Sequence, residues 1–162
     1  MAFNQLVRKY QQKIYWHIRK MVIDHDDADD LTQEVFVKVW KNLGNFRKDA
    51  QLYTWIYRIA TNECLTFLSN KKKRFFLPIH DVAGELSEKI DTSPDISGDE
   101  IQVKLQKALL RLPDKQRLVF NMKYYDEMKY EEISEILGTS VGALKTSYHL
   151  AVKKIEEFIK RD

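Results

Sequence analysis

The chain has 162 residues, 44% hydrophobic and 31% charged, with only 5 Gly, 3 Pro and 1 Cys. These counts exclude collagen-like, low-complexity and disulfide-stapled proteins, and the scarcity of cysteine favours a reducing, cytoplasmic setting. No stretch approaches the roughly 20 apolar residues that span a bilayer, so we expect no stable membrane insertion. The net charge of +3 hides opposite blocks, because residues 24–37 hold six acidic and no basic side chains, whereas residues 38–74 hold nine basic and two acidic.

Apolar residues at spacings of three and four predict an all-α protein without a sheet. The first stripe runs from Phe3 to Met21 and includes His17. Aspartates then break the pattern, and we expect a second helix from near Asp29, with Trp40 on its apolar face. A third long helix is predicted over 52–70, followed by a basic tail.

The composition changes between residues 75 and 100. Asp, Glu and Ser cluster there with Pro and Gly, and no periodicity persists, so this segment is predicted to be acidic and extended. Helical periodicity returns at Ile101 and continues to about Lys160. We therefore predict two small helical domains, residues 1–74 and 101–162, joined by a flexible acidic linker, residues 75–100.

The last two predicted helices are joined by Gly-Thr-Ser at 138–140, as in a helix-turn-helix. Gly138 allows a left-handed turn, and Ser140 is a good helix cap. Small side chains would let the second helix enter the major groove, while hydroxyls suit base edges and cations suit phosphates. A simple helical hairpin with small packing residues is the alternative. The candidate DNA-binding residues are Ser140, Gly142, Ala143, Lys145, Thr146, Ser147, His149 and Lys153.

Three short motifs extend this pattern: Leu-Pro-x-x-x-Arg at 112–117, Tyr-Glu-Glu-Ile at 130–133 and Ser-Val-Gly at 140–142. With them the C-terminal half resembles the promoter-reading domain of bacterial RNA polymerase sigma factors. The resemblance implies that the last helix reads the −35 element. Family members often carry Arg where this chain has Ser147 and Leu150, and an outward-facing Leu150 could touch a thymine methyl group.

The segment Asp-Leu-Thr-Gln-Glu-Val-Phe at 30–36 carries a second resemblance. It is similar to the sigma-factor region that binds polymerase and opens the −10 element. An exposed Val among polar groups suits a partner surface better than a solvated helix face, which is the alternative. The resemblance implies binding to the coiled coil of the polymerase β′ clamp by a face that holds Asp30, Gln33, Glu34, Val37 and Lys38.

The same resemblance implies that the loop at 45–51 captures a flipped base of the −10 element. Stacking, pocket contacts and charge must then offset the cost of flipping, which is a few kcal/mol. The following helix would line the single strand, and its basic end would hold phosphates. The implied −10 residues are Phe46, Arg47, Lys48, Asp49, Tyr53, Tyr57, Arg58, Asn62, Lys71, Lys72, Lys73 and Arg74.

This minimal two-domain plan is typical of the extracytoplasmic-function (ECF) group of the sigma-70 family. The resemblance implies a transcription initiation factor that catalyses no reaction and needs no cofactor or metal. Its implied partners are core RNA polymerase, through the β′ clamp and β subunit, promoter DNA and an anti-sigma factor.

Two readings from other classes compete with this one. A helix-turn-helix regulator with an N-terminal sensing domain would bind duplex DNA without polymerase. A metal-dependent enzyme could use the aspartates at 24–30, but the sequence has neither a second acidic metal-binding cluster nor a Gly-rich phosphate loop. Cys64 has no Cys or His at metal spacing, and we expect it to be a small buried hydrophobe.

Overall fold

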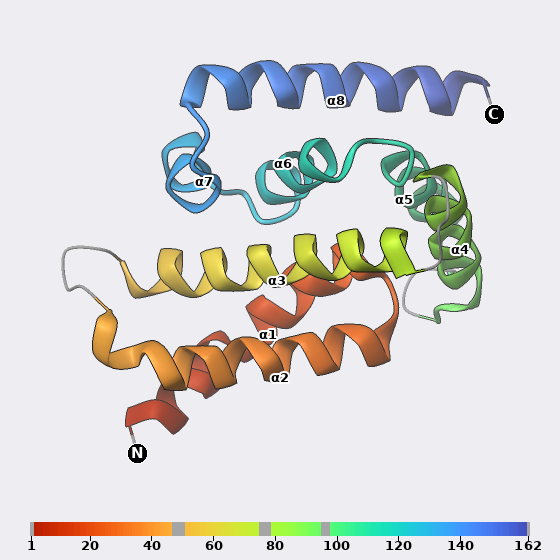
Figure 1. The fold of residues 1–162 in the computed structure, drawn as a ribbon. Coiled ribbons are helices and arrows are strands. Elements are labelled where there is room, and N and C mark those ends of the chain that lie inside the picture. Colours follow the sequence, from red (N-terminus) through yellow and green to blue (C-terminus); the bar gives the residue numbers. More distant parts are fainter. Residues whose placement is uncertain (1, 47–50, 75–78, 95–97, 162) are drawn as a thin grey trace.

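The structure is a computed structural model that describes residues 2–46, 51–74, 79–94 and 98–161, with the backbone alone for 74 and 79–83. These residues form helices and no strand, which confirms the all-α prediction. Figure 1 shows the elements, which run in the order α1 (Ala2–Val22), α2 (His25–Asn42), the 3₁₀ turn η1 (Leu43–Asn45), α3 (Leu52–Arg74), α4 (Ile79–Thr92), α5 (Glu100–Leu109), α6 (Asp114–Tyr124), α7 (Tyr130–Leu137) and α8 (Val141–Arg161).

Helix α2 begins at His25, four residues before the predicted start near Asp29. Asp24 is its N-cap, and the Asp24 carboxylate accepts a hydrogen bond from the Asp27 backbone N–H at 3.0 Å. Ile23 has a φ of 68°, which turns the chain sharply between α1 and α2. The aspartates therefore begin the second helix, because acids in a first turn complement the helix dipole.

Helix α4 contradicts the prediction of an extended segment over 75–100. Leu86 and Ile90, one turn apart, are 2% and 0% exposed and belong to the main apolar core. Burying two such side chains stabilises the helix by about 1.5–3 kcal/mol each. The prediction was wrong because the segment is rich in acidic residues and contains Gly84, as linkers do. Its few apolar residues form a helical stripe that is stable only when it packs against other elements.

The two halves of the chain pack directly on each other. Figure 1 shows α3 lying between α1 and α2 on one side and α6 and α7 on the other. One cluster of buried apolar side chains joins Met21 and Ile56 of the N-terminal half to Leu118, Met122 and Ile133 of the C-terminal half. A second, smaller cluster lies within the C-terminal half. The two-domain architecture is thus present in a closed arrangement.

Cys64 lies inside α3 and is 0% exposed, as expected from the sequence. Burial raises the pKa of its thiol to about 12, so almost no thiolate exists at neutral pH. We expect native protein at pH 8 to react with a disulfide reagent more than about a thousandfold more slowly than urea-unfolded protein. Absorbance of the released thiol measures both rates, and comparable rates would contradict the burial.

Candidate nucleic-acid and partner interfaces

The predicted partner face of α2 is exposed along its whole length. Asp30, Gln33, Glu34, Val37 and Lys38 are all exposed, and Val37 keeps 45% of its surface accessible. The Lys38 ammonium donates to the Glu63 carboxylate of α3, and the Gln33 amide donates to Asp29 at 3.3 Å. Four polar side chains thus frame one exposed apolar side chain on a helix that its own neighbours hold in place.

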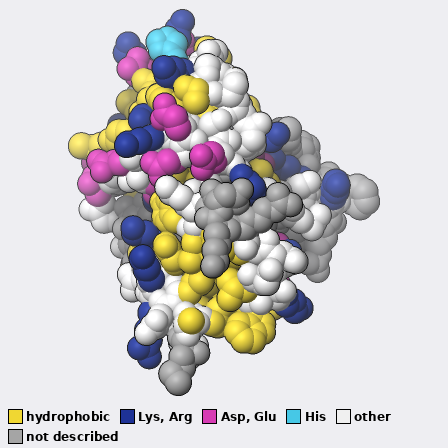
Figure 2. Space-filling model, turned by 90° about the vertical axis from the view of Figure 1, so that its left-hand side faces the viewer, with side chains coloured by type: hydrophobic (Ala, Val, Ile, Leu, Met, Phe, Trp, Pro, Cys, Tyr) yellow, Lys and Arg dark blue, Asp and Glu magenta, His cyan; other side chains and the backbone are white. Residues whose placement is uncertain are grey.

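An apolar groove lies beside this face, between α1 and α2, with a volume of about 710 Å³. In Figure 2, hydrophobic side chains gather on the lower half of the face shown, where the N-terminal helices lie. The groove includes Gln33 and Val37 of the predicted face. Its other lining residues are Phe3, Asn4, Val7, Gln11, Asp29, Thr32, Phe36 and Trp40.

Trp40 was expected in the core, and the structure corrects this prediction. The indole is 61% exposed and makes an edge contact with Phe3, with ring centroids 5.0 Å apart. Trp16 is also exposed, at 45%. Helical spacing could not reveal this, because it shows which side of a helix is apolar but not whether another element covers that side. The contribution of α1 to the groove was missed for the same reason.

The residues predicted to contact the −10 element fall into three environments. Tyr57 is 2% exposed and packs on Tyr53, with ring centroids 4.6 Å apart, whereas Arg58 and Asn62 are exposed. Phe46 is half-buried and packs on Trp55 at 5.2 Å. The remaining loop residues of this prediction lie outside the described part of the chain: Arg47, Lys48 and Asp49.

The basic end of α3 is paired within the chain. Lys71 lies 2.8 Å from Glu85 of α4, and Lys72 lies 2.7 Å from Asp114 of α6. Lys73 is exposed, and the Arg74 side chain lies outside the described residues. Two of the four predicted phosphate-binding cations are therefore neutralised by other elements in this conformation.

Helices α7 and α8 form the predicted helix-turn-helix. Gly138 has a φ of 68° and its N–H donates to the Ser134 carbonyl at 2.8 Å, which ends α7 in the left-handed conformation that glycine favours. The Ser140 hydroxyl accepts from the Ala143 N–H at 3.2 Å and caps α8. Ile133 and Leu144, 0% and 1% exposed, hold the two helices together.

The opposite face of α8 carries the side chains predicted to meet DNA. Ser147 is half-buried, and the Thr146 hydroxyl donates to the Gly142 carbonyl at 3.2 Å. The Lys145 ammonium lies 5.9 Å from the centre of the Tyr130 ring, which fixes it at one edge of this face. The other predicted residues of α8 and its cap are exposed: Ser140, Gly142, Ala143, His149 and Lys153.

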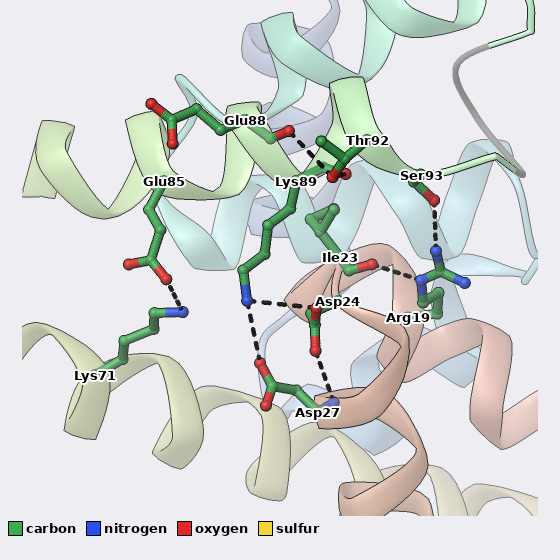
Figure 3. A network of polar contacts seen from close by, with 10 residues as sticks. All are labelled: Arg19, Ile23, Asp24, Asp27, Lys71, Glu85, Glu88, Lys89, Thr92 and Ser93. Atoms are coloured by element: carbon green, nitrogen blue, oxygen red, sulfur yellow. Dashed lines mark hydrogen bonds and ion pairs between the residues drawn. The ribbon is translucent and has the colours of Figure 1, made fainter.

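The acidic run at the start of α2 has a structural role. Figure 3 shows Lys89 of α4 reaching both Asp24 at 3.4 Å and Asp27 at 3.8 Å. Burial acts to raise the pKa of Asp24, but the Asp27 N–H and the Lys89 charge outweigh it and hold that pKa below its usual value. Burial and the Asp24 charge raise the pKa of Asp27. Among the described residues, no three His, Cys, Asp or Glu side chains converge as metal ligands.

The described residues thus form a two-domain helical protein with a helix-turn-helix, an arrangement typical of DNA-binding proteins, and with an apolar groove beside α2. Residues 6–74 match the family described as Sigma-70 region 2, and residues 102–155 match Sigma-70, region 4. Within the described residues, no helix is long and apolar enough to cross a membrane.

Curated relatives match over almost the whole chain. RNA polymerase sigma-H factor of Pseudomonas aeruginosa is 32% identical over 98% of this chain and 86% of its own length. ECF RNA polymerase sigma factor SigW of Bacillus subtilis is 35% identical over 91% of this chain and 83% of its own length. The chain belongs to the ECF sigma factors of the sigma-70 family. It is therefore a promoter-directing initiation factor of RNA polymerase, and a ligand-sensing regulator is not favoured.

Two solved structures share the fold. The sigma factor RpoE, in complex with the anti-sigma factor NepR from Bartonella quintana, aligns with a TM-score of 0.72 at 23% identity, over 99% of this chain and 98% of that one. CnrH, in complex with the cytosolic domain of CnrY, aligns with a TM-score of 0.70 at 24% identity, over 99% and 89%.

Proposed function

We propose that three surfaces of the chain, two in the N-terminal half and one in the C-terminal half, bind polymerase and the two promoter elements. The face of α2, together with the apolar groove, binds the β′ clamp of core polymerase. Helix α3 and the loop before it hold the opened −10 strand, and α8 reads the −35 element in the major groove. The observation that supports this division is that the α2 and α8 faces are exposed in separate halves, each within a region that matches one sigma-70 family region.

The chemistry of each surface suits its proposed ligand. An exposed Val37 beside Trp40 offers apolar contact area ringed by hydrogen-bonding groups, which is the composition of a protein interface. Tyr53 offers an aromatic surface for a base, and Arg58 a cation for phosphate. The small residues of α8 permit close approach to base edges. The chain itself catalyses no reaction, because binding energy shared with polymerase offsets strand opening.

We further propose that an anti-sigma factor regulates this chain and that it acts in the cytoplasm, where bacterial RNA polymerase works. Both solved structures of the same fold are complexes with a second protein, which is named as an anti-sigma factor in one of them. The exposed apolar groove is a surface that such a partner could cover.

Run-off transcription with purified core polymerase tests the proposed function. A library of promoter fragments is transcribed with core enzyme alone and with core enzyme plus this chain. Products that appear only with the chain support the proposal, and their upstream sequences give the two elements that it reads. Specific duplex binding without polymerase, with no new transcript, would favour a stand-alone regulator.

Lys145→Ala tests the edge of the α8 face. Because Lys145 is exposed and lies at the edge of that face, we expect it to contact a phosphate rather than a base. Promoter binding by the holoenzyme should weaken for all −35 sequences alike, and the slope of log affinity against log salt should fall by about 1. Lys160→Ala, near the far end of α8, is the control. A changed −35 preference would instead identify Lys145 as a base reader.

A further inference from the structure

Helix α1 carries positive charge that acidic groups leave largely unpaired. Residues 1–23 contain five basic and no acidic side chains. Two of the five are engaged elsewhere, since Lys20 lies 2.6 Å from Asp126 and Arg19 donates to the Ser93 hydroxyl of α4 at 2.7 Å, as Figure 3 shows. The other three are exposed, and no carboxylate in the described part of the chain pairs with them: Arg8, Lys9 and Lys13.

Two of these cations share a face of α1 with an exposed tryptophan. Lys9, Lys13 and Trp16 follow one another at spacings of four and three, so they lie along one side of the helix, about 10 Å from end to end. Trp16 is 45% exposed. Its ring centroid lies 5.1 Å from that of Tyr15, and the Arg19 guanidinium lies 5.9 Å from it. An aromatic side chain that its neighbours hold in place is thus presented to solvent beside two ammonium groups.

Two tyrosines border this face where α1 meets α3. Tyr10 of α1 and Tyr53 of α3 are half-buried, with ring centroids 6.1 Å apart. The Lys9 ammonium lies 5.4 Å from the centre of the Tyr10 ring, and the Lys13 ammonium lies 5.8 Å from the centre of the Tyr53 ring. Aromatic rings alternating with cations are typical of surfaces that bind single-stranded nucleic acid, because bases stack on the rings while the cations contact phosphates.

Tyr53 connects this face of α1 to the surface that is proposed to hold the −10 strand. It is the second residue of α3, so a strand that lies along α3 reaches α1 at the contact between Tyr53 and Tyr10. Other anionic partners use less of the surface. Duplex DNA keeps its bases stacked on one another, and an acidic peptide offers carboxylates to the lysines but no flat group to Trp16.

We propose that α1 is a second binding surface for single-stranded DNA, on which Lys9 and Lys13 contact phosphates while Tyr10 and Trp16 stack on bases. In the open promoter complex it holds the stretch of opened strand that adjoins the −10 element. That placement on the promoter rests on the proposed function of α3, whereas binding of a single strand by α1 is measurable on the chain alone.

Fluorescence anisotropy of a labelled 20-nucleotide thymidine strand measures this binding with the full chain. When Lys9→Ala and Lys13→Ala are combined, the slope of log affinity against log salt should fall by about 1.4, since each phosphate contact on a single strand contributes about 0.7. Trp16→Leu keeps an apolar side chain but removes the ring, and it should weaken binding at least about fivefold. Circular dichroism verifies that these exposed substitutions leave the helices intact.

Matched variants in the C-terminal half are the controls. Lys104→Ala combined with Lys160→Ala removes two exposed cations, and Tyr124→Leu removes an aromatic ring that is 52% exposed. Both should leave the affinity for the strand within twofold of the wild type and its salt dependence unchanged. Equal losses in the α1 variants and in these controls would overturn the proposal, because they would reflect total charge or hydrophobicity rather than a defined surface.

Polyglutamate, which has the charge of a strand but no bases, is the second probe. Trp16→Leu should leave the binding of polyglutamate unchanged. If Trp16→Leu also leaves the binding of the thymidine strand unchanged, the proposal is wrong, and weaker binding of polyglutamate by the lysine variant would then identify a face for an acidic protein.

Photo-cross-linking tests whether the promoter strand reaches this surface. A 5-iododeoxyuridine is placed at successive positions of the opened strand in complexes formed with core polymerase. Cross-links to Tyr10 or Trp16 should come from positions next to the −10 element, and their absence at every position would reject α1 as part of the strand's path. Strand binding that depends on α1, without any transcript in the run-off assay, would reject only the proposed function.

Discussion

Val37→Asp is expected to weaken the binding of core RNA polymerase at least about tenfold while leaving the melting temperature unchanged. Val37 is 45% exposed on α2 and lines the apolar groove, so its side chain contributes little to the free energy of unfolding. A carboxylate at the centre of an apolar contact must be desolvated without a partner, which costs about 1.4 kcal/mol or more, the equivalent of a tenfold loss. Titration of fluorescently labelled chain with core enzyme measures the affinity.

Ile101→Asp provides the matched control for this experiment. Ile101 is another exposed apolar residue, at 76%, but it lies in the first turn of α5, far from the groove in sequence and in the other half. The same change of chemistry there should leave polymerase affinity within twofold. Equal losses for both variants would indicate a general charge effect, and no loss for either would reject the groove as the polymerase site.

Local rules of sequence predicted the helix-turn-helix closely. Gly138 was expected to turn left-handed and Ser140 to cap α8, and both do so, because each depends on only a few neighbouring backbone atoms. The exposed face of α2 was likewise predictable, because it depends only on the helical period of the residues within that helix. These predictions succeeded because the short-range hydrogen bonds and the helical period that decide them are written in consecutive residues.

Features that depend on contacts between distant segments were not predictable in this way. Trp40 has the spacing of a core residue but no helix covers it, and α4 has the composition of a linker but finds a surface that buries Leu86. The burial of Tyr57 follows from α1, because its hydroxyl lies 3.5 Å from the carbonyl of Lys13, 44 residues earlier in the sequence, and the His17 ring packs on it. Periodicity in the sequence indicates which side of a helix is apolar. Whether that side is buried depends on which other helices pack against it in the fold.

Leu144→Ala is expected to have the largest effect on stability, because it removes a central contact of the helix-turn-helix. Leu144 is 1% exposed and lies in the main core between α7 and α8. Substitutions of buried Leu by Ala cost about 2–5 kcal/mol, a large part of the 5–15 kcal/mol that holds a typical domain folded. Chemical denaturation followed by circular dichroism should show a lower midpoint, and −35 binding should fall in proportion to the unfolded fraction.

Leu150→Ala on the same helix separates stability from recognition. Leu150 is 42% exposed on the side of α8 that we propose faces DNA, so its removal should change the unfolding free energy by less than about 0.5 kcal/mol. If its side chain contacts a thymine methyl group, holoenzyme affinity should fall only for promoters with thymine at one −35 position. A uniform loss across promoters would point to shape or phosphate contacts instead. A drop in stability as large as that of Leu144→Ala would contradict the assignment of the two faces of α8.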